Sequence, residues 1–111
     1  MVRHVIPEIQ AVSIRNLVNK MLRRLFEIVE DRKNYPVDGS YTNQLLNGGY
    51  EKAAQKVGEE AVEVIIAASE EGNQRTIEES ADLIYHLFVL LVQQGISLAE
   101  VEAELERRHM E

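Results

Sequence analysis

Residues 79–92 read ESADLIYHLFVLLV, and this stretch decides the expected fold. From residue 81 onward it is apolar on almost every side of a helix, with Asp82 and His86 as its strongly polar members. A helix on the surface of a globular protein carries one apolar stripe, whereas a helix that is apolar all round lies in a core or an interface. We therefore expect residues 74–94 to form a central or interface helix.

The segment before this helix predicts a second long helix, over residues 50–71. Gly72-Asn73 separates the two, because glycine and asparagine commonly end helices. Gly58 weakens the second helix by about 1 kcal/mol relative to alanine. Its position beside acidic residues indicates either the close approach of another backbone or a ligand, or a relief of crowding. The apolar stripe of this helix consists of Ala53, Ala54, Val57, Ala61, Val64, Ile65 and Ala68.

The rest of the chain also shows the 3.6-residue period of helices. An amphipathic helix is predicted over residues 13–32, a short helix over 41–46, and a last helix from Ser97, which forms a capping-box pattern with Glu100. Long runs of alternating apolar and polar residues, which are typical of strands, do not occur. At 111 residues the chain is expected to be one all-α domain, a helical bundle.

Charge and cysteine content limit the possible functions. The formal net charge is −7, so a nucleic-acid-binding surface is not expected, and an anionic small substrate would need metal ions to mediate contact. No apolar run approaches the roughly 20 residues that span a bilayer, so no membrane association is expected. The chain has no cysteine, which excludes disulfides and thiolate chemistry and fits the reducing cytoplasm.

Five carboxylates form one pattern across the two long helices. Glu59-Glu60-x-x-Glu63 is followed, after fifteen residues, by Glu79-x-x-Asp82. Acids three or four positions apart share one helix face, so two such faces opposed across a helix pair would concentrate negative charge in an apolar setting. Like charges held together there are costly unless a cation compensates them. Mg²⁺ is the natural compensating ion, because it takes oxygen ligands and grips phosphates.

Each acid also has a simpler structural explanation. The glutamates of the first group could line a solvated helix face, since glutamate is a good helix former and is mostly exposed. Glu79 could close a capping box with Thr76, although a helix start near Asn73 competes with it and is favoured. Asp82 needs a partner in an apolar run, either His86 in a structural pair or a metal ion. The matched spacing on two adjacent helices favours the metal.

Basic and hydroxyl side chains near the acids have two interpretations. Lys52 and Lys56 lie one turn apart and could either pair with neighbouring glutamates or contact phosphates. Ser40, Tyr41 and Thr42 open the short helix, where exposed backbone N–H groups suit a phosphate, but a plain N-cap is the default explanation. Taken alone, these residues do not decide between a structural role and a substrate role.

Four stretches together resemble a known family. They are Ser-Tyr-Thr at 40–42, KVGEEAVEVIIAA at 56–68, ESADLIYHLFVLL at 79–91 and ELERRH at 104–109. In order and spacing they are similar to the phosphoribosyl-ATP pyrophosphohydrolases, which act at the second step of histidine biosynthesis. The two acidic motifs alone mark only the wider superfamily of all-α nucleotide pyrophosphohydrolases, which includes MazG-type enzymes and enzymes that hydrolyse dUTP or dCTP.

The resemblance implies a fold and a reaction. The fold would be an α-helical homodimer, in which helices of both subunits complete cores of the four-helix-bundle type. The reaction would be Mg²⁺-dependent hydrolysis of the α–β phosphate bond of 1-(5-phosphoribosyl)-ATP, giving phosphoribosyl-AMP and pyrophosphate in the cytoplasm. Residues 1–20 would be an N-terminal extension that the family does not require, and residues 21–111 would be the pyrophosphohydrolase domain.

The resemblance also implies roles for individual residues. The metal ligands would be Glu60, Glu63, Glu79 and Asp82. Glu59 would complete the catalytic set by orienting a water molecule and taking its proton. Lys56 and Lys52 would contact phosphates, and the nucleotide or its phosphoribosyl arm would be held by Ser40, Tyr41 and Thr42, with His86 close to the substrate.

Two other functions compete with this one. A house-cleaning (d)NTP pyrophosphohydrolase of the MazG or dUTPase type would share the metal site and differ in the loop that selects the substrate. A non-catalytic helical dimerisation module would carry the acids as solvated charges and would leave Asp82 unexplained. Ion binding would stabilise the native state of either enzyme but not that of the module.

Overall fold

The computed structural model describes residues 14–109, and this part of the chain is helical without any strand. The all-α prediction is therefore confirmed. The sequence predicted every helix close to its observed bounds but did not predict a π-helical turn. In chain order the elements are α1 (Ile14–Asn34), α2 (Tyr41–Asn47), α3 (Gly49–Ile66), the π-helical turn η2 (Ala67–Glu71), α4 (Asn73–Gln93) and α5 (Leu98–His109).

Most of the expected N-terminal extension, together with Ser13, lies outside the described residues. α1 begins at Ile14, so the boundary expected after residue 20 falls inside one continuous helix. The domain expected from residue 21 onward thus shares its first helix with the end of the extension.

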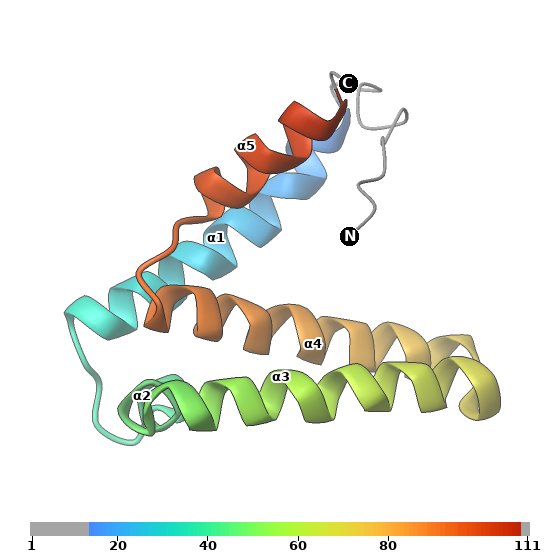
Figure 1. Cartoon of the computed structure of the whole chain (residues 1–111), viewed down its shortest axis with the longest axis horizontal. Coiled ribbons are helices and arrows are strands. Elements are labelled where there is room, and N and C mark those ends of the chain that lie inside the picture. The colour runs from blue at the N-terminus through green and yellow to red at the C-terminus, as the bar shows by residue number, and fades with distance from the viewer. Residues whose placement is uncertain (1–13, 110–111) are drawn as a thin grey trace.

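The helices form two pairs that diverge from a common junction (Figure 1). α3 and α4 lie antiparallel along each other and are joined by η2 and Gly72. α5 makes an angle of 109° with α4 and runs beside α1. An ion pair of 2.9 Å between Arg23 of α1 and Glu102 of α5 joins these two helices. α2 lies at the end of the α3–α4 pair. The two helices that carry the predicted acids are therefore direct neighbours.

Local signals in the sequence explain where the helices begin and end. The Oγ of Ser40 accepts a hydrogen bond of 3.2 Å from the backbone N–H of Asn43 and so caps α2. The Oγ of Ser97 accepts a bond of the same length from the N–H of Glu100, as the predicted capping pattern requires. Between α3 and α4, Gly72 has φ +94°, a conformation that residues with a side chain rarely adopt.

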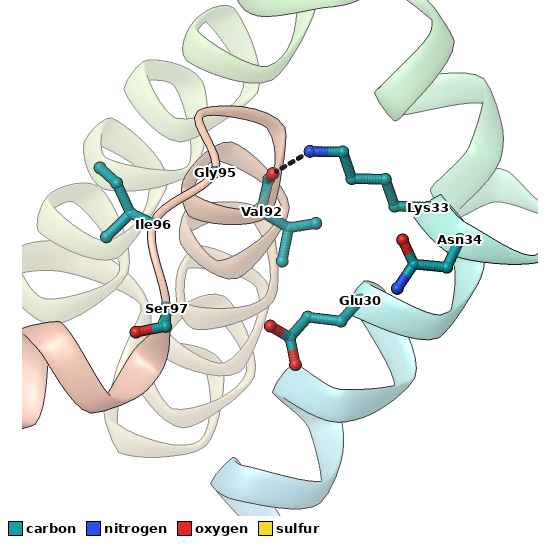
Figure 2. A pocket seen from close by; sticks show the side chains of 7 residues that line it. All are labelled: Glu30, Lys33, Asn34, Val92, Gly95, Ile96 and Ser97. Carbon is teal, nitrogen blue, oxygen red and sulfur yellow. Dashed lines mark hydrogen bonds between the residues drawn. The ribbon is translucent and has the colours of Figure 1, made fainter.

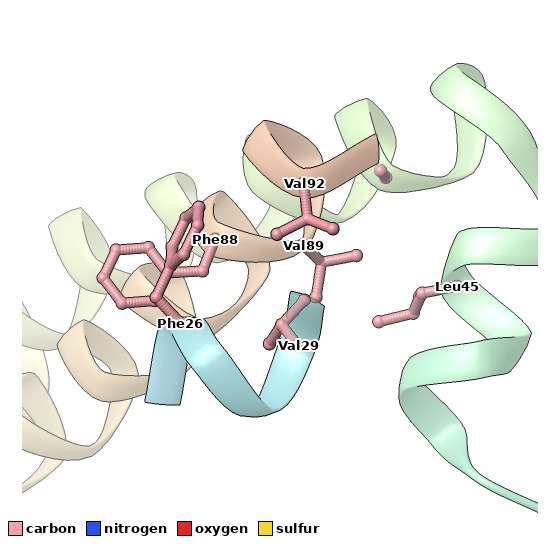
Figure 3. Packing of buried hydrophobic residues seen from close by; sticks show 7 residues of the cluster. Phe26, Val29, Leu45, Phe88, Val89 and Val92 are labelled. Carbon is pink, nitrogen blue, oxygen red and sulfur yellow. The ribbon is translucent and has the colours of Figure 1, made fainter. Parts of the chain in front are cut away.

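The hydrophobic core lies where the two helix pairs meet (Figure 3). Phe26 and Val29 of α1 pack against Phe88 and Val89 of α4, and Leu45 of α2 points into the same cluster. The rings of Phe26 and Phe88 meet edge to face with their centroids 5.1 Å apart. Each such buried side chain stabilises the fold by about 1.5–3 kcal/mol. The cluster thereby fixes α2 against the C-terminal half of α4.

The apolar stripe predicted for α3 is correct only in part. Ala53 is buried, but Ile65 is 67% exposed, and Ala67 is buried in place of Ala68. Successive residues of a helix are rotated by about 100°, so Ile65 points well away from the face of half-buried Val64. The stripe is therefore narrower than its apolar composition indicated.

The predicted central helix, α4, is covered on one side only. Phe88 and Val89 are buried in the core, whereas Leu87 is 38% exposed. No single helix within residues 14–109 has the length and apolar composition of a membrane span, although α4 and α5 together pass that test as a bent pair. Further exposed apolar side chains on the α3–α4 pair are Val62, Ile65, Ile66 and Ile77.

Candidate metal and nucleotide site

Three of the five predicted acids converge between α3 and α4. Glu60 of α3 and Glu79 and Asp82 of α4 each offer a carboxylate oxygen, and these oxygens lie within 4.8 Å of one another. Glu79 is buried, Glu60 is half-buried and Asp82 is exposed, so this carboxylate cluster reaches from the helix interface to the surface. Its oxygens fit a hard divalent ion, which takes oxygen ligands and keeps several of its waters.

The environment of Glu79 favours a bound cation. Glu79 is 7% exposed, and this burial raises the pKa of its carboxyl above the usual value. Arg75 acts in the opposite direction. The acids Asp82, Glu60 and Glu63 raise the pKa further. The net upward shift comes first from burial, and a divalent ion in the cluster would offset both the burial and the repulsion between the acids.

Arg75 is a residue of the site that the sequence predictions missed. Its guanidinium forms ion pairs with Glu78 and Glu79, and its Nε lies 4.0 Å from a carboxylate oxygen of Glu71. The i, i+4 spacing between Arg75 and Glu79 was the signal that could have identified it, since such residues are neighbours on a helix. The chain thus places a cation of its own beside the buried member of the cluster.

The side chains of Asp82 and His86 do not form the structural pair that their spacing allowed as one of two interpretations. His86 is 6% exposed, and its Nδ1 lies 2.7 Å from the backbone oxygen of Asp82 instead. The carboxylate of Asp82 is exposed and belongs to the cluster. α4 begins at Asn73, as favoured, so Glu79 lies inside the helix and does not close a capping box with Thr76.

The other two predicted acids lie beside the cluster. Glu63 is exposed and outside the group of three, yet close enough to raise the pKa of Glu79. Glu59 is exposed and accepts a hydrogen bond of 3.0 Å from Gln55. This bond, aided by Lys56, lowers the pKa of Glu59. The structure therefore groups three of the four expected metal ligands and leaves Glu59 exposed outside this group.

Lys56 lies between the cluster and α2. Its Nζ is 3.5 Å from a carboxylate oxygen of Glu59 and 3.5 Å from one of Glu60. Burial acts to lower the pKa of Lys56, but Tyr41 and the two glutamates outweigh it and raise that pKa, so the ammonium stays charged. Lys52 is exposed and contributes to lowering the pKa of Glu59. Of the two lysines, Lys56 lies closer to the predicted metal ligands.

Two of the three predicted hydroxyl residues are hydrogen-bonded to α4. Tyr41 Oη lies 3.1 Å from Nε2 of His86, and the Thr42 hydroxyl is hydrogen-bonded to that of Tyr85. Ser40 is the N-cap of α2, which was the default explanation for it. Tyr85 is a second residue that the predictions missed, and its position in an apolar run gave no signal of a polar partner.

A cavity of about 180 Å³ lies elsewhere, where α1 meets the turn between α4 and α5 (Figure 2). Glu30, Lys33 and Ser97 line it, and none of the five predicted acids does. The Nζ of Lys33 donates a hydrogen bond of 3.1 Å to the backbone oxygen of Val92, in the last turn of α4. The N–H of Gly95 donates to the same oxygen, so Lys33 adds a contact that joins α1 to the C-terminal end of α4.

Most of the chain is similar to one protein family. The model of the family described as phosphoribosyl-ATP pyrophosphohydrolase matches residues 22–109, which include every site residue named above. A protein of Bacillus cytotoxicus named phosphoribosyl-ATP pyrophosphatase is 47% identical over 91 residues, which are 82% of this chain and 85% of that protein. The protein of the same name from Listeria welshimeri is 53% identical over 88 residues, 79% of this chain and 84% of its own. A bifunctional histidine biosynthesis protein of Caldanaerobacter subterraneus is 48% identical over 90 residues, 81% of this chain and 44% of that protein.

Proposed function

The chain belongs to the phosphoribosyl-ATP pyrophosphohydrolase family, and we propose that it hydrolyses the α–β phosphate bond of 1-(5-phosphoribosyl)-ATP in histidine biosynthesis. The products are phosphoribosyl-AMP and pyrophosphate. The observation that carries the proposal is the convergence of Glu60, Glu79 and Asp82 beside the charged Lys56. Such a site combines oxygen ligands for a metal with a cation for a phosphate.

The proposed cofactor is Mg²⁺, held by Glu60, Glu79 and Asp82, with Glu63 as the fourth ligand. When bound, it supplies charge neutralisation for the triphosphate and lowers the pKa of a coordinated water. The burial of the Glu79 carboxylate among other acids supports this assignment, because a group in this setting gains from a nearby divalent cation.

The remaining residues orient the substrate and the attacking water. Lys56, and from the surface Lys52, would hold phosphates. Glu59 would orient the water and, through its contact with Lys56, keep the lysine in place. Its lowered pKa makes it a weak proton acceptor, so we propose orientation rather than proton transfer as its main role. The nucleotide and its phosphoribosyl arm would be held by Ser40, Tyr41 and Thr42, which His86 supports.

We further propose a homodimer in the cytoplasm. The exposed apolar side chains Val62, Ile65 and Ile77 on the α3–α4 pair offer a face that a second copy would cover. A highly charged nucleotide does not cross a membrane unaided, so an enzyme that uses it works where it is made. Residues 1–20 remain proposed as an extension outside the family domain 21–111.

The proposal is tested by pyrophosphate release from phosphoribosyl-ATP, with and without Mg²⁺, beside ATP, dUTP and dCTP. We expect fast, Mg²⁺-dependent release from phosphoribosyl-ATP alone. A preference for dUTP or dCTP would assign the chain to house-cleaning hydrolysis instead. Release from none of them would favour the non-catalytic module.

Asp82→Asn should reduce kcat by at least about a hundredfold, because an amide cannot supply the charge that the metal site requires. The matched control is Glu70→Gln, which neutralises an exposed acid of η2 outside the cluster and should leave kcat unchanged. Circular dichroism should show full helicity in both variants. Retained turnover in a folded Asp82→Asn chain would remove Asp82 from the site.

A further inference from the structure

Two neighbouring residues at the start of α2 are hydrogen-bonded to two neighbouring residues of α4. Tyr41 Oη lies 3.1 Å from Nε2 of His86, and the Thr42 hydroxyl is bonded to that of Tyr85. The rings of Tyr41 and Tyr85 are also stacked, with centroids 6.2 Å apart and planes inclined by 25°. The segment proposed to bind the nucleotide is therefore attached to the helix that carries Glu79 and Asp82.

The hydrogen bonds place one proton of the His86 ring. Its Nδ1 lies 2.7 Å from the backbone oxygen of Asp82, and a carbonyl oxygen only accepts, so Nδ1 carries a proton. A neutral imidazole then presents Nε2 as an acceptor, to which the Tyr41 hydroxyl donates. Since His86 is also 6% exposed, both ring nitrogens are occupied inside the chain and neither is left to bind substrate.

Tyr85 contacts every other member of this network. Its hydroxyl is bonded to Thr42, its ring stacks on Tyr41, and it meets the ring of His86 edge to face with centroids 4.9 Å apart. Burial raises the pKa of Tyr85, so its hydroxyl stays protonated and either hydroxyl of the Tyr85–Thr42 pair can donate. One side chain thus fixes both hydroxyl residues of α2 that are proposed to bind substrate.

We infer that Tyr85 and His86 are positioning residues, which set the placement of the first turn of α2 relative to the carboxylate cluster. Asp82 precedes them by three and four positions on α4, so both lie one turn from a proposed metal ligand. A shift of α2 against α4 would misalign bound nucleotide and metal, and small misplacements of a substrate are costly in enzymes. The inference rests on the proposed function, because it takes Tyr41 and Thr42 to bind substrate.

The first test compares KM with kcat in Tyr85→Phe, which removes the hydroxyl and keeps the ring. We expect KM for phosphoribosyl-ATP to rise about three- to tenfold, the equivalent of one neutral hydrogen bond, with kcat within about twofold because the cluster is intact. The matched control is Tyr35→Phe, which removes the hydroxyl of a tyrosine that is 72% exposed and should change neither constant.

Repeating the Tyr85→Phe substitution in a chain that already carries Thr42→Val shows whether Tyr85 acts through Thr42. In Thr42→Val the Tyr85 hydroxyl has no partner, so adding Tyr85→Phe should change KM by less than about twofold. If Tyr85→Phe raised KM equally in the native chain and in the Thr42→Val chain, or raised it in neither, the inference would be overturned. An inactive native chain would reject the proposed function instead, so the two failures are distinguishable.

Nitrogen NMR of protein labelled with ¹⁵N-histidine tests His86 without any substrate. We expect a protonated Nδ1 and an unprotonated Nε2, and Tyr41→Phe should shift the Nε2 resonance by removing its donor. Tyr35→Phe should leave the resonance in place. A proton on Nε2 in the native chain, or no response to Tyr41→Phe, would contradict the positioning role.

Discussion

At the residue scale, Glu79 is the proposed metal ligand whose burial has a consequence for stability. Burial raises the pKa of its carboxyl above the ordinary value, so ionisation is harder in the folded chain than in the unfolded one. The stability that the neutral carboxyl contributes is fully present below the unfolded pKa and is lost as pH rises through the folded pKa. At neutral pH and without a divalent ion, the charged side chain should therefore destabilise the fold.

Glu79→Gln should raise the melting temperature of the metal-free protein near pH 7, because glutamine resembles the neutral carboxyl. The difference from the native chain should shrink as the pH falls through the folded pKa and then below the unfolded pKa, where the carboxyl becomes neutral in both states. Mg²⁺ should stabilise the native chain and have little effect on the variant. Thermal unfolding followed by circular dichroism, in EDTA and in Mg²⁺ and at several pH values, measures these three effects. Glu70→Gln, which neutralises an exposed acid outside the cluster, is the control. A lower melting temperature for Glu79→Gln near pH 7 would contradict this account.

At the scale of the elements, two glycines near the acids have opposite structural roles. Gly58 lies inside α3, and an added Cβ there would meet no atom of the chain within 4 Å. Crowding within the chain therefore does not explain this glycine. Gly72 also has open space around it, but its φ of +94° ends η2 in a conformation that alanine adopts only with strain.

The same substitution should therefore have opposite effects at the two positions. Gly58→Ala should raise the free energy of unfolding by up to about 1 kcal/mol through helix propensity. Gly72→Ala should lower it by about 1 kcal/mol or more. Urea denaturation of the two variants measures both values. A loss of stability in Gly58→Ala would instead indicate that another chain or a ligand approaches this position.

The elements were predictable from sequence to the extent that their causes are local. Ser40, Ser97 and Gly72 act on their own helix ends, so the bounds could be placed without knowing the fold. The pairing of Arg75 with Glu79 was equally local and was overlooked. The bond between Thr42 and Tyr85 joins residues 43 positions apart, so it depends on how α2 folds back on α4 and had no signal in the sequence.

The acids of the site also divide into features that local spacing predicts and features that depend on the fold. The spacing of Glu60, Glu79 and Asp82 predicted their convergence, because two helices in contact bring matched faces together. Sequence spacing alone did not separate Glu63 from this group. It also did not show that Glu79, rather than Asp82, is the buried member, since that depends on the angle at which α4 packs on α3.

The whole molecule is more open than a compact chain of its size. Its radius of gyration is 15.4 Å, against about 13 Å expected for a compact domain of this length. The two diverging helix pairs in Figure 1 account for the difference. In the proposed dimer, a second copy would cover the exposed apolar side chains on the α3–α4 pair and complete the four-helix cores.

Sedimentation equilibrium should therefore give a mass near twice the 12.7 kDa of one chain. Ile65→Glu places a charge on the exposed apolar face of α3 and should reduce this mass to that of a single chain, because a buried, unpaired charge is costly in an interface. Val37→Glu makes a comparable change in the loop before α2 and should leave the mass unchanged. A native chain that sediments as a monomer would reject the dimer.

α5 differs from the other long helices in how it is attached. Within the described residues it has no buried side chain, and its ion pair with α1 is formed by exposed groups that stabilise little. Its backbone amides should therefore exchange with deuterium through local opening, without waiting for the core around Phe88 to unfold. Only Leu98, at the start of α5, packs against the core cluster within the described residues of this helix, so we expect the rest of α5 to open before the core. The protection of α5 from exchange would then report on any partner that covers it.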